Sequence, residues 1–222
     1  MNLTIFSCST GFHSYPIPNR SYVEKLSLDY PIKGRWMDGL SILDVKREIP
    51  SYLNGCDRIL ILHIGAVEAF TYPAANVIEW CAEYLLRNPC DPYALSFLIP
   101  KMIEASHAIV HKQDLFLPVL EPGEFEFILH QTLHMIQGTK TIIVGMSKPK
   151  TPDKPFWVEQ ALVFNQILEG KAKEFNAEFI NVWEPCKDFV VDNNHLNEEG
   201  HLFLYHTIWK ILTKQSKEKD HE

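Results

Sequence analysis

An acidic residue and a histidine stand three positions apart near the C-terminal end of the chain, in Asp192-Asn193-Asn194-His195. A carboxylate can hold an imidazole in one orientation, and the imidazole can then accept a proton from a nucleophile. The nucleophile of such a triad comes from a distant part of the sequence, because triads are assembled in space. Ser9, which follows the apolar run 3–6 near the N-terminus, is the candidate nucleophile.

Each of these features also has a simpler interpretation. The Asp192–His195 stretch is typical of a turn before a helix, with Asn194 or Asn197 as the helix cap. Ser9 is equally suited to a strand-to-helix loop in which it only caps the helix. Cys8 is an alternative nucleophile beside Ser9, although thiols are often simply buried. The residues alone leave these alternatives open.

Composition sets limits on the class of protein. The chain has 222 residues, of which 46% are hydrophobic and 22% charged, which is enough for one sizeable core. The net charge of −7 disfavours nucleic acid or an anionic membrane as the main partner. The five cysteines are widely spaced without a CxxC pair, so we expect reduced thiols. Because no signal peptide and no membrane span are recognisable, we expect a cytoplasmic location.

Five short apolar runs are predicted to be buried strands: residues 3–6, 30–33, 58–64, 141–146 and 178–182. Helical patterns separate them, which predicts βαβ units and a mostly parallel sheet in a single α/β domain over residues 1–213. The mostly helical segment 77–137, with breaks at 88–92 and 121–123, is longer than one crossover needs. We expect it to be an insertion that forms a lid or a specificity wall. Residues 214–222 are expected to be a frayed, charged tail.

In a parallel sheet the loops that follow the strands meet at one edge. Ser9, the Gly65–Glu68 stretch and the Asp192–His195 stretch should therefore lie close together. Their order resembles that of the SGNH (GDSL-like) hydrolases, and the resemblance covers most of the chain. The most specific part is the late block Asp192-x-x-His195-Leu196-Asn197-x-x-Gly200-His201.

The resemblance implies a flavodoxin-like three-layer α/β/α sandwich and a serine esterase that needs no metal or cofactor. Ser9 would be the nucleophile, His195 the general base, and Asp192 the residue that orients His195. The backbone N–H groups of Ser9 and Gly39 would form the oxyanion hole. The substrate, a small-molecule or saccharide ester, would lie in a pocket lined by four residues: His13, Gly65, Val67 and Glu68.

Two blocks depart from the family pattern. The family's Gly-Asp-Ser is replaced by Ser7-Cys8-Ser9, and its Gly-x-Asn-Asp by Gly65-Ala66-Val67-Glu68. Val67 therefore stands where the family has an asparagine whose side chain donates to the oxyanion. Losing one such donor typically costs ~3 kcal/mol of transition-state stabilisation. A carboxylate at Glu68 would repel an oxyanion, so we expect it to have an orienting or structural role.

The leading expectation is thus a serine-dependent esterase or deacylase. The alternatives are an acyl (acetyl) transferase in polysaccharide synthesis and a catalytically impaired protein of this fold that binds a glycan or a partner. A flavodoxin-like nucleotide or flavin binder is a further alternative, but no GxxxxGK[ST] or GxGxxG motif supports it. His130 and His134 have metal-ligand spacing without a third ligand, which is weak evidence for a metal. Neither the substrate nor the oligomeric state follows from the sequence.

Overall fold

The computed structural model describes residues 2–8, 21–37, 39–53, 58–113, 116–150, 155–191 and 194–219. Three residues singled out in the sequence, Ser9, His13 and Asp192, lie outside the described residues. The parts of the chain that lead to and from them are described.

Five strands form the central sheet, and all of its strand pairs are parallel. They are β1 (Asn2–Ser7), β2 (Ile32–Trp36), β3 (Arg58–His63), β6 (Lys140–Val144) and β7 (Glu178–Ile180). Their order is β2-β1-β3-β6-β7, which is the flavodoxin-like order. The strand order reverses between β1 and β3, and open α/β sheets bind their ligands at such a switch point. The predicted fold class is confirmed.

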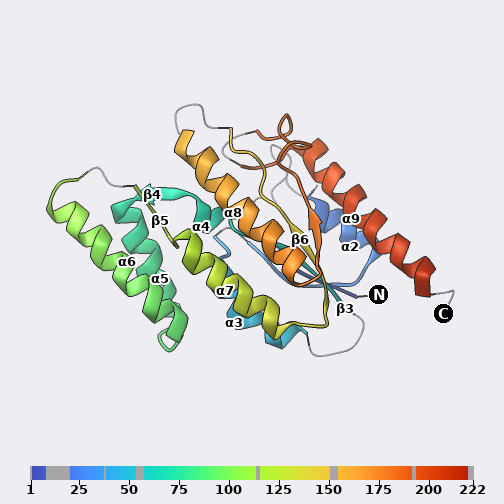
Figure 1. Ribbon diagram of the computed structural model, residues 1–222, viewed down its shortest axis with the longest axis horizontal. Helices are drawn as coiled ribbons and strands as arrows, with labels where there is room; N and C mark the ends of the chain where they lie inside the picture. Colours follow the sequence, from blue (N-terminus) through green and yellow to red (C-terminus); the bar gives the residue numbers. More distant parts are fainter. Residues whose placement is uncertain are drawn as a thin grey trace.

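Helices cover both faces of this sheet (Figure 1). One layer consists of α2 (Tyr22–Asp29) and α9 (Glu198–Lys219). The other contains α3 (Ile42–Tyr52), α7 (Pro122–Met135) and α8 (Pro155–Glu174). The alternation of side chains along β3 explains the arrangement, because Ile59 and Ile61 join the core under α2 and α9, whereas Leu60 and Leu62 join the core under α3, α7 and α8.

Side-chain caps fix where two of these helices begin. A capping box starts α2, as the spacing of Ser21 and Glu24 in the sequence indicates: the Glu24 N–H donates to Ser21 Oγ at 3.3 Å, and the Ser21 N–H donates to the Glu24 carboxylate at 2.9 Å. Ser41 and Asp44 form the same arrangement at the start of α3. These local hydrogen bonds explain why both helix starts are readable in the sequence.

The segment 77–137 contains most of a helical pair, a short strand and a layer helix. Helices α5 (Ala74–Arg87) and α6 (Pro92–Val110) pack against each other beyond the sheet (Figure 1). Strand β5 (Phe116–Pro118) pairs antiparallel with β4 (Thr71–Pro73). Helix α7 packs on α3 and α8, so it belongs to the helical layer of the sheet and not to the α5–α6 pair. The β4–β5 ribbon was not predicted, because three-residue strands leave no periodic signal.

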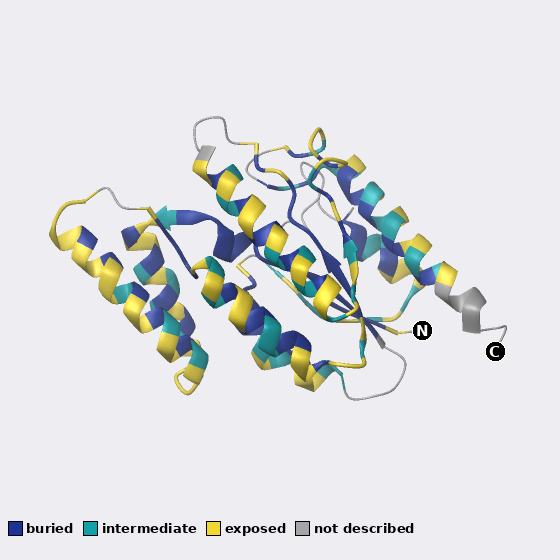
Figure 2. Cartoon of the chain, in the orientation of Figure 1, coloured by how far each residue is buried: buried dark blue, intermediate teal, exposed yellow. Residues whose placement is uncertain are grey.

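Several strand boundaries differ from the predicted ones by one to three residues. Strand β2, for example, begins at Ile32 and not at Tyr30, because the Tyr30 N–H donates to Leu26 O at 2.9 Å and thus still belongs to the end of α2. Helix α9 starts at Glu198 and continues to Lys219. Figure 2 shows the central strands buried and the outward helix faces exposed. In the described part of the chain, every helix is too short or too polar to cross a membrane.

Candidate active site

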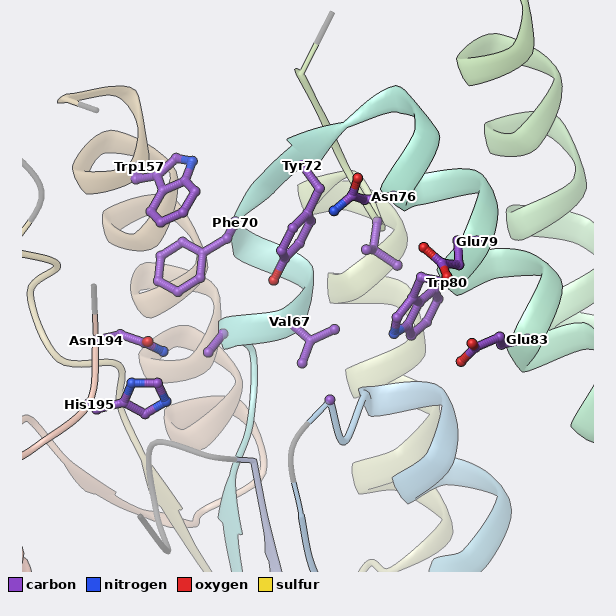
Figure 3. Close-up of a pocket in the computed structure, with 13 residues that line it drawn as sticks. Val67, Phe70, Tyr72, Asn76, Glu79, Trp80, Glu83, Trp157, Asn194 and His195 are labelled. Carbon is purple, nitrogen blue, oxygen red and sulfur yellow. The ribbon is translucent and has the colours of Figure 1, made fainter. Parts of the chain in front are cut away.

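A pocket of about 440 Å³ opens at the edge of the sheet where the strands end (Figure 3). Its volume is in the range of small-molecule sites. Its lining comes from loops and helices far apart in the sequence: Gly39, Ala66, Val67, Phe70, Tyr72, Asn76, Glu79, Trp80, Glu83, Val119, Trp157, Asn194 and His195. The structure therefore places His195, Gly39 and Val67 around one pocket.

His195 lies at the pocket beside Asn194 (Figure 3), and both belong to the turn between Val190 and Leu196. Val190 and Leu196 form an antiparallel bridge across the base of the turn, and the Val191 N–H donates to the His195 carbonyl at 3.0 Å. The Ser147 hydroxyl, just beyond β6, donates to the Asn194 carbonyl at 2.8 Å. The backbone that carries His195 is thus held both within the turn and from the neighbouring strand.

Asn197 connects this turn to α9. Its side-chain oxygen accepts the Gly200 N–H at 3.0 Å, and its own N–H donates to the Phe189 carbonyl at 2.8 Å. Of the two caps considered from the sequence, Asn197 is the one observed. The cap interpretation and the site interpretation of this stretch are therefore compatible, since the cap fixes the loop that presents His195.

Gly65 turns the chain from β3 into the short helix α4 (Ala66–Ala69). It is the N-cap of α4 and has a φ of 106°, a left-handed conformation that favours glycine. This turn places Val67, which is 9% exposed, on the pocket wall. The side chain of Val67 offers no hydrogen-bond donor. The residue that differs from the family pattern therefore lines the pocket.

Glu68 and Gly65 were expected in the pocket, but neither is among its lining residues. Glu68 is fully buried, and its Oε1 accepts the Ile42 N–H at the start of α3 at 2.6 Å. A helix N-terminus favours a carboxylate there. Burial nevertheless raises the pKa of Glu68 to about 7. The structure thus assigns Glu68 the structural role, because its position in α4 directs it to the core.

The N-terminal side of the site is defined by β1 and by the loop before α3. Ser7 lies opposite His63 in the parallel register of β1 and β3, so β1 ends at the same edge of the sheet as β3, which Gly65 follows. Cys8 is 1% exposed, and its N–H donates to the His63 carbonyl at 3.0 Å. Such burial makes Cys8 a poor candidate for a nucleophile. Gly39 lines the pocket with a φ of 70°.

Aromatic side chains make up much of the remaining wall (Figure 3). Trp157 stacks on Phe70 with ring centroids 4.7 Å apart, and its indole N–H donates to Thr71 Oγ at 3.1 Å. Tyr72 and Trp80 lie further along the pocket (Figure 3). The sequence does not mark these four aromatic residues as pocket residues, because an aromatic side chain near a strand end more commonly packs in the core.

The face of α5 that lines the pocket was also missed. It carries Asn76, Glu79, Trp80 and Glu83. Their spacing of three and four residues places them on one side of the helix. That spacing is the signal that would have found them, but it does not distinguish a pocket wall from an ordinary solvated face. Only the packing of α5 beside α4 and β4 makes this face part of a pocket.

The pair His130 and His134 lies on α7 and does not line the pocket. Their rings are stacked with centroids 6.4 Å apart, and His130 Nδ1 lies 3.2 Å from the Glu174 carboxylate. Within the described ranges, no three or more His, Cys, Asp or Glu side chains are grouped as a metal site would require. The pair is accounted for by surface contacts of α7 with α8.

Comparisons with known proteins give a consistent result at the level of the fold. Neither the known protein families nor the curated proteins contain a sequence match to this chain. Solved structures do match. A lipase/acylhydrolase from Enterococcus faecalis superposes with a TM-score of 0.63 at 12% identity, covering 97% of each chain. A member of the lipolytic G-D-S-L family from Veillonella parvula gives 0.60 at 14% identity, covering 96% of this chain and 98% of that one.

An acetyl xylan esterase matches with a TM-score of 0.60 at 13% identity, over 95% of this chain and 99% of that one. The coverage is nearly complete in both directions, so the α5–α6 region does not prevent an alignment over the whole chain. Together with the strand order and the position of His195, these matches show that the chain has the α/β/α fold of the SGNH (GDSL-like) hydrolases.

Proposed function

We propose that this protein is a serine esterase that acts on an acylated small molecule or carbohydrate through Ser9, His195 and Asp192. The observation that carries the proposal is the shared pocket of His195, Gly39 and Val67, which come from three separate loops at the carboxyl edge of the sheet. The late block that contains His195 is also the part of the sequence most similar to the SGNH hydrolases.

The chemistry proceeds in two balanced steps. Ser9 Oγ attacks the ester carbonyl carbon while His195 accepts the hydroxyl proton, and the carbonyl oxygen becomes an oxyanion. The intermediate then expels the alcohol, which takes the proton from His195, and leaves an acyl group on Ser9. Water then attacks the acyl group while His195 accepts its proton, and the carboxylic acid is released as Ser9 Oγ takes that proton from His195. Asp192 orients the imidazole and stabilises its charged form.

The pocket supports an ester of moderate size with a flat or ring-shaped part. Phe70, Tyr72, Trp80 and Trp157 provide faces on which a sugar ring can pack. Glu79 and Glu83 provide hydrogen-bond acceptors for hydroxyl groups at the α5 end of the pocket. Acetylated saccharides fit this description, and two of the structural matches are described as esterases of acetylated xylan or xylooligosaccharides.

The first experiment is fluorophosphonate labelling of the wild type and of the Ser9→Ala and His195→Ala variants, together with turnover of short p-nitrophenyl esters. We expect labelling and turnover in the wild type, with both lost or reduced at least ~10³-fold in the two variants. A Ser9→Ala protein that keeps the wild-type rate would refute the role of Ser9. Cys8→Ala is the matched control, because it changes the neighbouring residue and should leave labelling intact.

A second candidate function is favoured by Val67, whose side chain lacks the donor that the family has at this position. It is a protein of this fold that binds a glycan or a partner without turnover. A folded wild type that binds acetylated oligosaccharides but is not labelled would support this function and exclude the esterase. Transfer to an acceptor sugar is the third possibility, which product analysis with an added oligosaccharide distinguishes from hydrolysis.

A further inference from the structure

We propose that the Tyr72 hydroxyl donates a hydrogen bond to the oxyanion of the reaction, in place of the side-chain amide that is absent at position 67. This inference rests on the proposed esterase function. Tyr72 would thereby be a catalytic residue, although it belongs to none of the sequence blocks that resemble the family.

The need for such a donor follows from the pocket itself. Val67 occupies the wall of the pocket after β3 and presents only methyl groups there. An oxyanion hole with only backbone donors lacks the interaction that a side-chain amide supplies, which is worth about 10²–10³-fold in kcat. A neighbouring side chain with an uncommitted O–H or N–H can supply it if it reaches the same region.

The position of Tyr72 meets this requirement. Figure 3 shows its hydroxyl pointing into the pocket, toward the space between Val67 on one side and Asn194 and His195 on the other. An ester carbonyl that is attacked next to His195 must lie in this space. Trp157, which also lines the pocket, has its N–H bound to Thr71 Oγ at 3.1 Å and is not available as a donor.

The ring of Tyr72 is held by the β4–β5 ribbon. Tyr72 lies opposite Leu117 in the antiparallel register, and the ring packs against the larger of the two hydrophobic cores. Thr71, the preceding residue, is tied to Trp157. The hydroxyl is therefore preorganised at the end of a fixed ring, and preorganisation gives an oxyanion donor its strength.

The hydroxyl is also protonated, and no described residue occupies it. It makes no hydrogen bond with any residue of the described part of the chain. Burial, followed by the nearby Glu68 and Cys8, raises the pKa of Tyr72 well above its ordinary value, so the O–H stays a donor at neutral and mildly alkaline pH.

The test compares Tyr72→Phe with the wild type, using p-nitrophenyl acetate turnover and the rate of fluorophosphonate labelling. Labelling is included because the phosphonyl oxygen occupies the place of the oxyanion. We expect kcat and the labelling rate to fall about 10²-fold, within the range known for a lost oxyanion donor, while KM changes only a few-fold. Tyr93→Phe is the matched control, since Tyr93 lies outside this pocket and its loss should change neither rate.

A second pair of variants tests directly whether the Tyr72 hydroxyl takes the place of the amide that is absent at position 67. Val67→Asn restores the family's donor, so in a Tyr72→Phe background it should recover at least ~10-fold of the lost kcat. In the wild-type background, Val67→Asn should have a much smaller effect, because the donor site is already filled. Thermal unfolding of all variants identifies any that are slow because they are misfolded.

The outcomes separate this inference from the proposed function. A wild type without labelling or turnover rejects the esterase itself. A labelled, active wild type with an equally active Tyr72→Phe protein leaves the esterase standing and overturns the role of Tyr72. A Tyr72→Phe protein in which only KM rises would likewise overturn it, since that result indicates a binding contact. A large loss in Asn194→Ala with none in Tyr72→Phe would move the donor role to Asn194.

Discussion

Glu68 illustrates how a residue at a motif position can serve the backbone instead of the substrate. It follows Val67 in the block that replaces Gly-x-Asn-Asp, yet its carboxylate is buried and accepts the Ile42 N–H at 2.6 Å. It thereby ties α4, which bears Val67, to the start of α3, which follows Gly39. Two walls of the pocket are fixed relative to each other by one side chain.

The first prediction at the residue scale concerns the charge of Glu68. Its pKa is about 7 in the folded protein, against 4.5 ordinarily. Between these values the folded state holds a proton that the unfolded state has released, so stability falls as the pH rises from about 4.5 to about 7. Glu68→Gln keeps an acceptor for Ile42 and removes the charge. The free energy of unfolding of Glu68→Gln should therefore be larger than that of the wild type. The difference should grow as the pH rises and reach ~3 kcal/mol at neutral pH.

Urea unfolding of both proteins between pH 4.5 and 8 measures this difference. Glu68→Leu is the control, because it removes the charge together with the acceptor. It should be less stable than Glu68→Gln by ~1–3 kcal/mol at every pH, since the Ile42 N–H is then buried without a partner. Parallel stability profiles for the wild type and Glu68→Gln would contradict the raised pKa.

At the scale of elements, the turn 190–196 and helix α9 act as one unit. The turn presents His195, and Asn197 fixes the start of the helix that follows it. Helix α5 has a comparable role on the opposite wall, where it contributes four lining residues, whereas α6 contributes none. Within segment 77–137, part of α5 and Val119 line the pocket. That this segment forms a lid or a specificity wall stays a prediction.

The second prediction concerns Asn197. Replacement by alanine removes the cap of α9 and should cost ~1 kcal/mol of stability. Because the same residue anchors the turn, kcat on p-nitrophenyl esters should fall several-fold beyond what the small loss of folded protein explains. Asn197→Asp retains an acceptor for the Gly200 N–H and should keep both stability and kcat near the wild-type values. An Asn197→Ala enzyme with lower stability but unchanged kcat would show that the cap does not position His195.

Across the whole molecule, a buried polar cluster joins the sheet to the α2–α9 layer. His63 of β3, Tyr22 of α2 and His201 of α9 are all buried. The ring centroid of Tyr22 lies 5.8 Å from the ring centroid of His63 and 6.1 Å from that of His201. The Tyr22 N–H donates to His201 Nδ1 at 3.4 Å. Burial, with a smaller contribution from His201, lowers the pKa of His63 to about 3. At neutral pH the folded core therefore holds His63 as a neutral imidazole.

The third prediction is acid sensitivity that originates in this cluster. As the pH falls from about 6.5 toward 3, the unfolded chain binds a proton at residue 63 before the folded chain does, so stability is lost. The loss attributable to His63 is at most ~5 kcal/mol. A His63→Gln variant should lose less stability than the wild type over this pH range, measured by thermal unfolding. The control is His107→Gln, at an exposed position on α6, which should follow the wild-type profile. A His63→Gln profile parallel to that of the wild type would disprove the prediction.

The sequence by itself determined those features that depend on neighbours along the chain. The five apolar runs became the five strands of the sheet, the Ser21–Glu24 spacing became a capping box, and the order of the blocks placed His195 at the edge where β1 and β3 end. These signals are local because strand burial, capping and turn formation each involve residues a few positions apart.

Tertiary structure alone decided which side chains face the pocket. Glu68 turned inward and Val67 outward because α4 is a single helical turn set by Gly65, and Tyr72 reached the pocket because β4 pairs with β5, more than forty residues away. No local pattern encodes such a pairing, since its stability comes from contacts that exist only once the chain has folded.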